Sequence, residues 1–219
     1  MLNCFIEVKS KISSKRMVRR NDLEDKIMKL LKRLPKVERG QKIILAIDGL
    51  SRSGKTTFVR NIEQHMREKN NSVYIFHIDD YIVERKRRYN TGYEEWYEYY
   101  NLQWDVEMLK DSLFKNLKES NELRLLTYDC CSDTQRFHTV KIPDTCLIII
   151  EGVFLQRKEW RNFYDFVVYL DCSREKRLNR ESDETQKNIE KFEKRYWKAE
   201  DYYLKSISPM RQADLVIRN

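Results

Sequence analysis

Five stretches of apolar or β-branched residues, each about the length of a strand, recur along the chain. They cover residues 42–47, 72–78, 146–150, 166–170 and 213–217. Their hydrophobicity is continuous rather than alternating, which is typical of strands that are covered on both faces. The pattern therefore predicts a five-stranded parallel sheet sandwiched between helices.

Between these stretches, apolar residues recur at helical spacing. The pattern predicts helices over residues 22–34, 55–69, 93–101, 105–118, 173–181 and 187–205. Residues 123–128 and 138–142 flank a polar turn and predict an antiparallel hairpin outside the main sheet. Because strands and helices alternate, we expect an α/β layered domain with its ligand at the carboxyl ends of the strands.

The first 20 residues show no convincing period and are predicted to form a basic, flexible arm. Met1 and Met17 both offer a natural start. Residues 21–219 are predicted to form a single domain that opens with the helix at about 22–34. Leu23, Ile27 and Leu30 give that helix its apolar stripe.

The composition is that of a globular protein, with 219 residues, 41% hydrophobic and 36% charged. The net charge of +8 falls mostly within residues 1–40, so the rest of the chain is nearly neutral. A solvated arm is the commoner reason for such a run, and we expect no nucleic-acid partner.

The sequence also bears on location. No apolar run approaches the roughly 20 residues of a membrane helix, and no secretory signal core is evident. The five cysteines are odd in number and lack C-x-x-C spacing, which favours free thiols in a reducing compartment. We therefore expect a cytoplasmic protein without a membrane partner. The oligomeric state stays open, a homo-oligomer included.

One motif identifies the chemistry more sharply. Residues 49–56 match G-x-x-x-x-G-K-[ST] between a predicted strand and a predicted helix. In such a loop, backbone N–H groups surround phosphate oxygens, the lysine reaches the terminal phosphates, and the threonine hydroxyl reaches Mg²⁺. The sequence therefore predicts ATP and Mg²⁺ binding by Gly49, Ser51, Arg52, Ser53, Gly54, Lys55, Thr56 and Thr57.

Carboxylates follow two of the predicted strands. Asp79 and Asp80 end one, and Glu151 ends another, so both sites fall beside the predicted phosphates. One carboxylate can accept a proton from an attacking hydroxyl while the other serves the magnesium shell. The alternatives are a helix cap or turn for one of the two aspartates, and an exposed strand end for Glu151. The absence of an N-K-x-D motif weakens the GTPase interpretation.

The order of several segments resembles one family. These segments are 49–57, 79–81, 128–129, 150–152, 169–171 followed by Arg177 and Arg180, and 213–217. Over about residues 40–219 the chain resembles the uridine kinase and phosphoribulokinase-like P-loop kinases, most closely the bacterial uridine kinase-like proteins. The resemblance implies a P-loop kinase fold with a small β-hairpin lobe and a lid. It also implies transfer of the γ-phosphoryl group of ATP, with Mg²⁺, to a hydroxyl of a small molecule.

The resemblance also implies roles. Asp79 matches the catalytic aspartate, Glu151 the glutamate near Mg²⁺, and Arg177 and Arg180 the arginines that neutralise the transferring phosphate. Metal contacts are expected from Thr56, Glu151 and Asp79, and substrate contacts from Asp80, Tyr81, Tyr128 and Trp104. Judged from the residues alone, the two arginines could instead pair with Glu181 or Asp183.

Departures from the family pattern concern the acceptor. The His-Pro-Asp-x-Phe-Asp segment reads as residues 100–105 here, without the ribose-binding carboxylate, and the base-reading histidine falls near Asp133. Residues 181–186 replace a Gly-Arg-rich lid, and Arg52 replaces a small residue and either points to solvent or guards the nucleotide. Residues 86–89 attract an anionic substrate or form a solvated loop.

These departures leave the acceptor open. A nucleoside is one reading, and a vitamin, a sugar or a hydroxy acid is another. From a different class, the chain could be a nucleotide-dependent protein whose basic arm binds RNA.

Overall fold

The computed structural model describes residues 22–187 and 189–219. The chain divides into a unit that ends at Leu34 and a unit that covers Pro35–Asn219. The described part of the first unit is a helix over residues 22–33, as predicted. The predicted basic arm lies outside the described residues, and a single domain over 21–219 stays a prediction.

The second unit contains the predicted parallel sheet. Its strands run in the order β2-β5-β1-β6-β7, and all neighbouring pairs are parallel. They span β1 Lys42–Asp48, β2 Val73–His77, β5 Cys146–Gly152, β6 Phe166–Asp171 and β7 Leu215–Arg218. Asp48 is opposite Gly152, so β1 and β5 end together and the segments that follow them lie side by side.

Helices connect these strands. They are α2 Lys55–Glu68, α3 Arg85–Arg88, α4 Glu95–Asn101, α5 Val106–Ser112, α6 Arg174–Leu178, α7 Asp183–Lys187, α8 Ile189–Lys191, α9 Lys198–Ile207 and α10 Pro209–Gln212. Short 3-10 helices cover Ile78–Tyr81, Phe114–Asn116 and Arg161–Phe163, and a π-helical segment covers Phe192–Trp197. Three predicted helices are therefore wrong in extent. The one over 105–118 ends at Ser112, the one over 173–181 ends at Leu178, and the one over 187–205 is a series of helical segments that ends at Ile207.

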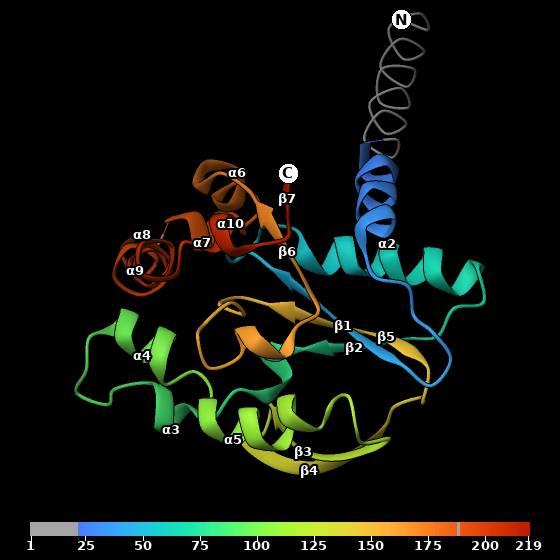
Figure 1. The fold of residues 1–219 in the computed structure, drawn as a ribbon. Helices are drawn as coiled ribbons and strands as arrows, with labels where there is room; N and C mark the ends of the chain where they lie inside the picture. The colour runs from blue at the N-terminus through green and yellow to red at the C-terminus, as the bar shows by residue number, and fades with distance from the viewer. Residues whose placement is uncertain (1–21, 188) are drawn as a thin grey trace, which may run out of the picture. The chain divides into compact units, whose positions relative to one another are not determined.

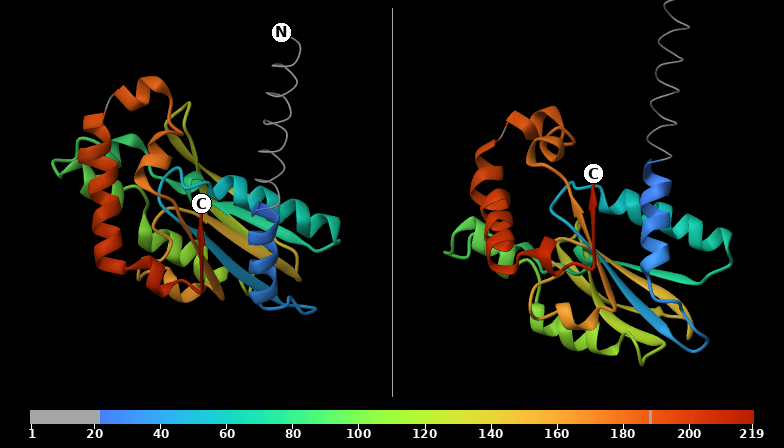
Figure 2. Two further views of the ribbon diagram at one scale, coloured as in Figure 1. Left: turned by 90° about the horizontal axis from the view of Figure 1, so that it is seen from above. Right: turned by 45° about the horizontal axis from the view of Figure 1, so that its top comes forward.

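The sheet buries both of its faces. Successive side chains of a strand point to opposite faces, and Leu45 and Ile47 are as fully buried as Ile44 and Ala46. Helix α2 lies along one face, and α5 with the hairpin lies along the other (Figure 1). The segment from α7 to α9 stands beside the carboxyl ends of the strands rather than over either face (Figure 2). Double coverage explains why the strands read as continuous apolar runs.

The predicted hairpin is also present, and it is longer than expected. Its strands are β3 Glu122–Asp129 and β4 Thr134–Lys141, with Thr127 opposite Arg136. Asp133 in the turn has a φ of 51°, a conformation that aspartate tolerates better than most residues. The hairpin pairs only with itself among the described strands.

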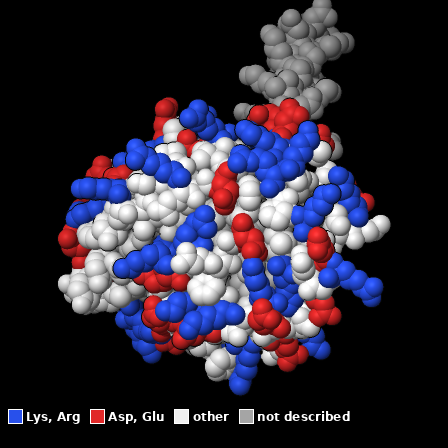
Figure 3. Space-filling view, in the orientation of Figure 1, with Lys and Arg blue, Asp and Glu red and all other residues white. Residues whose placement is uncertain are grey.

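Charged side chains of both signs are interspersed over the face seen in Figure 3. This mixture agrees with the nearly neutral charge of the chain beyond residue 40. Within the described residues, no helix has the length and the apolar character needed to cross a membrane.

The thiols in the described residues are free, and this leads to a prediction. Cys130 and Cys131 are exposed and unbridged, with their Sγ atoms 4.0 Å apart. Adjacent cysteines form only a strained disulfide, so we expect all five cysteines of the chain to titrate as free thiols. Titration of denatured, unreduced protein with a chromogenic thiol reagent checks this, and fewer than five thiols would contradict it.

Candidate active site

A cavity of about 700 Å³ opens at the carboxyl ends of the strands. Its wall includes residues from the loop after β1, the turn after β2, the end of β5, the turn after α6, helix α8 and the π-helical segment. Of the residues predicted from the sequence, it contains Ser51, Arg52, Gly54, Lys55, Thr56, Thr57, Asp79, Glu151 and Arg180. The structure therefore brings together residues that lie up to about 130 positions apart in the chain.

The loop after β1 is held by close packing, which accounts for its two glycines. A Cβ atom on Gly49 would lie 2.8 Å from the carbonyl oxygen of Leu170 and 2.8 Å from Ser53 Oγ. Gly54 has a φ of 99°, and a Cβ atom there would lie 2.7 Å from Asn219 Nδ2. Gly54 precedes α2, so the free N–H groups of the first turn of that helix face an anion-binding position.

Lys55 is the buried cation of this loop. Its side chain lines the cavity, and its Nζ donates to the carbonyl oxygen of Leu50 at 3.0 Å. Burial lowers the pKa of Lys55, while the negative charges of Glu151 and Asp79 partly oppose that shift. A lysine whose only hydrogen bond is to a backbone carbonyl retains donors for phosphate oxygens.

Glu151 connects the loop to β2. Its Oε1 accepts from Thr56 Oγ1 at 3.0 Å and from His77 Nδ1 at 2.7 Å. Burial alone would raise the pKa of Glu151, but the bond from His77 and the charge of Lys55 outweigh burial and hold the pKa below its ordinary value. The hydrogen bond to Glu151 in turn raises the pKa of His77.

The oxygens near Glu151 fit a hard divalent cation. Glu151 Oε2 is buried and has no hydrogen-bond partner among the described residues, although buried polar atoms are normally satisfied. An ionised carboxylate beside a threonine hydroxyl is the kind of donor set that Mg²⁺ takes, with water completing its shell. The residues therefore fit the magnesium contacts predicted for Thr56 and Glu151.

Asp79 and Asp80 differ in their access to the cavity. Both lie in the 3-10 helix Ile78–Tyr81, not at the end of an extended strand as expected, and only Asp79 lines the cavity. Although Asp79 is open to the cavity, the surrounding walls reduce its solvation and raise its pKa. The positive charge of Lys55 opposes this shift, and the negative charge of Glu151 adds to it. An aspartate with a raised pKa is a better proton acceptor than an ordinary one.

Arg180 lies at the cavity, and Arg52 lies beside it. Arg180 Nη1 donates to the carbonyl oxygen of Arg52 at 2.6 Å. Arg52 adopts a φ of 59° and its Nε donates to Glu181 Oε1 at 2.7 Å. The side chain of Arg52 is thus anchored to Glu181 at the cavity rim while 58% of it stays exposed, and Arg180 does not form the alternative pairing with Glu181.

Arg177 lies outside the cavity, and its contacts correct two expectations: that it neutralises the transferring phosphate, and that it pairs with Glu181 or Asp183. Its guanidinium is buried and pairs with both carboxylate oxygens of Glu200, at 2.7 and 2.8 Å. It also donates to the carbonyl oxygens of Ser51 and Cys172. Arg177 does not line the cavity, so it does not face a transferring phosphate, and its partner is neither Glu181 nor Asp183.

None of the four predicted substrate residues lines the cavity: Asp80 lies outside it, and so do Tyr81, Trp104 and Tyr128. Trp104 and Tyr81 belong to the hydrophobic core, and Trp104 Nε1 donates to the carbonyl oxygen of Ile78 at 2.9 Å. Their apolar area favours burial over substrate contact. Tyr128 stays in the hairpin lobe, where its hydroxyl donates to Asp133 Oδ1 at 2.9 Å and accepts from Arg88 Nη2 at 3.2 Å.

The basic run at 86–89 is engaged with protein groups. Arg88 is buried and donates to the carbonyl oxygen of Val83 at 2.7 Å, while Arg87 pairs with Asp105. Neither a solvated loop nor an anion trap describes Arg88, which instead joins α3 to the hairpin.

The cavity wall contains residues that the sequence did not single out as a site. They are Tyr99 from α4, Val153 after β5, and Lys191, Phe192 and Tyr196 from the α8 and π-helical segments. Phe192 and Tyr196 are four residues apart, a helical spacing that indicates packing before ligand contact. Both side chains are half-buried, so they pack and face the cavity at once.

Gly152 provides a prediction about how Asp79 is held. A Cβ atom on Gly152 would overlap Ile78 Cγ2, and Ile78 is buried directly before Asp79. We expect Gly152→Ala to lower the free energy of unfolding by about 1–3 kcal/mol, the usual cost of overpacking, and to displace the Asp79 turn. Chemical denaturation and a turnover assay check this. The double variant Ile78→Ala with Gly152→Ala should be more stable than the sum of the two single effects predicts, and simple additivity would contradict the argument.

Comparison with known proteins agrees with this geometry. Residues 44–219 match the sequence profile of the phosphoribulokinase / uridine kinase family. A uridine kinase from Borrelia duttonii (strain Ly) is 28% identical over 186 residues, covering 80% of this chain and 85% of that protein. A solved structure titled a possible uridine kinase from Bacillus stearothermophilus superposes with a TM-score of 0.78 at 50% identity, covering 90% of this chain and 98% of that one. Phosphoribulokinase from Rhodobacter spheroides, at 15% identity and a TM-score of 0.59 over 82% of this chain and 70% of that one, shares the fold.

Proposed function

The chain belongs to the phosphoribulokinase / uridine kinase family, and from this premise we propose that it transfers the γ-phosphoryl group of ATP, with Mg²⁺, to a hydroxyl group of a small molecule. One observation carries the proposal. The buried cation Lys55, the Thr56–Glu151 pair and the carboxylate of Asp79 surround a single cavity. Phosphoryl transfer needs charge neutralisation, metal placement and a proton acceptor close together.

Each side chain has a defined part in the proposed reaction. The oxygen of the acceptor hydroxyl forms a bond to the γ-phosphorus, and Asp79 accepts the proton that this hydroxyl loses. The bond between the γ-phosphorus and the bridging oxygen of ADP breaks, and ADP leaves. Lys55 and Arg180 meet the negative charge that builds up on the phosphoryl oxygens. Thr56 and Glu151 would hold Mg²⁺, which when bound shields the phosphate charge.

The aromatic part of the cavity wall supports a ring-bearing substrate. Tyr99, Phe192 and Tyr196 line the cavity, and aromatic surfaces favour planar or cyclic ligands. The relatives named uridine kinase make a nucleoside the first candidate.

A specific observation favours a different acceptor. Leu102 stands at the position of the family's ribose-binding carboxylate, and Asp105, the remaining carboxylate of that segment, accepts from Met108 N as the cap of α5 and does not line the cavity. The ribose hydroxyls would therefore lack their usual carboxylate. A vitamin, a sugar or a hydroxy acid is the second candidate.

The test is a coupled assay of ADP production with MgATP across nucleosides, vitamins, sugars and hydroxy acids. We expect one class to stimulate ADP release well above the rate with ATP alone. A protein that binds MgATP but releases ADP with no acceptor would argue against the kinase proposal. A protein that binds no nucleotide at all would overturn it.

A further inference from the structure

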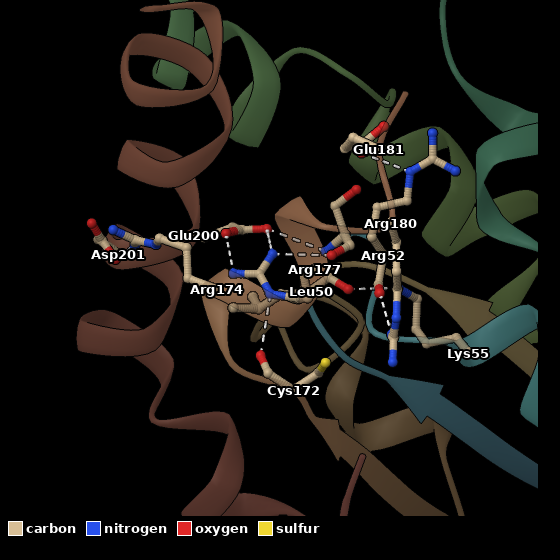
Figure 4. Close-up of polar contacts among 11 residues, drawn as sticks. Leu50, Arg52, Lys55, Cys172, Arg174, Arg177, Arg180, Glu181, Glu200 and Asp201 are labelled. Carbon is tan, nitrogen blue, oxygen red and sulfur yellow. Dashed lines mark hydrogen bonds and ion pairs between the residues drawn. The ribbon is translucent and has the colours of Figure 1, made fainter. Parts of the chain in front are cut away.

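Helix α9 contacts the phosphate loop, which is residues 49–56 after β1. Glu200 on α9 accepts from the backbone N–H of Ser51 at 3.2 Å, inside the loop. The same carboxylate receives both terminal nitrogens of Arg177, and Arg177 also donates to the carbonyl oxygen of Ser51 at 3.0 Å. Figure 4 shows the pair joining α6, α9 and the loop. Both polar groups of the Ser51 backbone are thus bound by one ion pair.

A second contact from the same helix reaches the base of the loop. Tyr203 donates its hydroxyl proton to Asp48 Oδ2 at 2.6 Å, and Asp48 directly precedes Gly49. Tyr203 follows Glu200 by three positions, so both side chains project from one face of α9. Helix α9 is therefore hydrogen-bonded to Asp48, directly before the loop, and to Ser51 within it.

These contacts decide which loop groups are left for a ligand. The N–H of Ser51 is committed to Glu200, and the N–H of Ser53 donates to the carbonyl oxygen of Leu50 at 3.1 Å. The first N–H groups of α2, which have no partner within the helix, remain available to phosphate oxygens. Rotation of Ser51 would change the path of the loop into that helix.

We propose that Glu200 is a positioning residue for nucleotide binding, fixing Ser51 and through it the shape of the phosphate loop. The π-helical segment that precedes α9 supplies Phe192 and Tyr196 to the wall of the same cavity. The inference rests on the proposed function only in that the loop binds the phosphates of ATP.

The chemistry of the pair suggests a discriminating substitution. One carboxylate serves three donors: Oε1 receives Ser51 N and one nitrogen of Arg177, and Oε2 receives the other nitrogen. In Glu200→Gln only one acceptor oxygen remains, and the new amide nitrogen faces a guanidinium donor. The substitution keeps the shape of the side chain but cannot satisfy all three donors.

The chain offers two matched controls. Arg195 and Glu98 form a second buried ion pair, with side chains only 1% and 4% exposed, and this pair makes no contact with the phosphate loop. Glu98→Gln therefore reproduces the loss of a buried partner. Asp201 lies next to Glu200 and joins the same two helices through an exposed pair with Arg174. Asp201→Asn therefore tests the α6–α9 connection without the loop.

The experiment measures the Kd of MgATP by calorimetry without any acceptor, together with the melting temperature, for the wild type and the three variants. We expect Glu200→Gln to weaken MgATP about tenfold or more, the scale of a lost charge-assisted hydrogen bond. Glu98→Gln should lower the melting temperature, because it leaves a buried charge unpaired, with Kd changed by no more than about twofold. Asp201→Asn should change neither quantity.

A residue-level readout separates positioning from general loosening. In the nitrogen–proton NMR spectrum, the Ser51 amide should shift and lose exchange protection in Glu200→Gln and keep both in Glu98→Gln. If Glu200→Gln fails to fold, Arg177→Lys keeps the charge but loses the two-pronged contact, and it should weaken MgATP in the same direction. Equal Kd values in the wild type and in the folded variant would overturn the inference, whereas a wild type that binds no MgATP would overturn the proposed function instead.

Discussion

Replacing Lys55 with alanine is expected to remove phosphoryl transfer while leaving the protein folded. Lys55 lines the cavity, and within the described residues its ammonium donates a hydrogen bond to the backbone carbonyl oxygen of Leu50. Its ammonium supplies the positive charge that a transferring phosphoryl group needs in a poorly solvated site. We expect kcat to fall at least about 10²- to 10³-fold, the scale for losing one stabilising donor. The anions beside Lys55 keep other contacts in this variant, because Glu151 stays bonded to Thr56 and His77 and Asp79 is open to the cavity.

A lysine at the other end of the same helix provides the control. Lys69 caps α2 at its C-terminus, is exposed and lies outside the cavity. Lys69→Ala removes the same charge from the same element and should retain near-wild-type turnover. Circular dichroism and the melting temperature report folding. Retained turnover in Lys55→Ala would show that phosphoryl transfer does not need this lysine. Unfolding of the variant would show that Lys55 stabilises the core.

The fold was largely predictable because its signals are local or periodic. Continuous apolar runs such as residues 146–150 can be buried on both faces in few arrangements, and the parallel sheet followed. The phosphate loop combines sharp residue requirements with a fixed place between strand and helix. The breaks in the predicted helix over 187–205 could not be read, because a π-helical segment depends on how Arg195 and Tyr196 pack against α4 rather than on their sequence spacing.

The site was harder to predict where partners come from distant elements. Arg177 and Arg180 are three positions apart, yet Arg180 lines the cavity and Arg177 turns to Glu200, 23 residues later in the chain. The helix α6 ends at Leu178, before Arg180, and the spacing of the two arginines gives no information about Glu200 on α9. Trp104 is a similar case. A tryptophan is equally suited to contact a substrate or to be buried in the core, and the sequence does not show that this one packs against Phe154 and Trp160.

The second large effect is expected for Asp79→Asn. Asparagine keeps the size of the side chain and its hydrogen bonding but cannot accept the proton of the acceptor hydroxyl. We expect kcat to fall about 10²- to 10⁴-fold, the range for losing a general acid–base group, while the Kd of MgATP changes far less because Lys55 and the loop carry that contact. The pKa of Asp79 is raised by its weakly solvated surroundings. Since only the ionised form accepts a proton, wild-type kcat should fall as the pH drops through that raised pKa, and Asp79→Asn should lack this acidic limb.

Asp80 is the internal control for this assignment. It lies one residue further along the same 3-10 helix, is exposed, and does not line the cavity. Asp80→Asn removes an equal charge at nearly the same place, so a purely electrostatic effect on the site would appear in both variants, whereas loss of the proton acceptor appears only in Asp79→Asn. The measurement is kcat against pH and the Kd of MgATP for both variants with the acceptor found in the ADP screen. If Asp80→Asn is the inactive variant, the proton acceptor is Asp80. If both variants keep near-full turnover, neither aspartate accepts the proton and the carboxylate at the end of β5, Glu151, becomes the group to replace next.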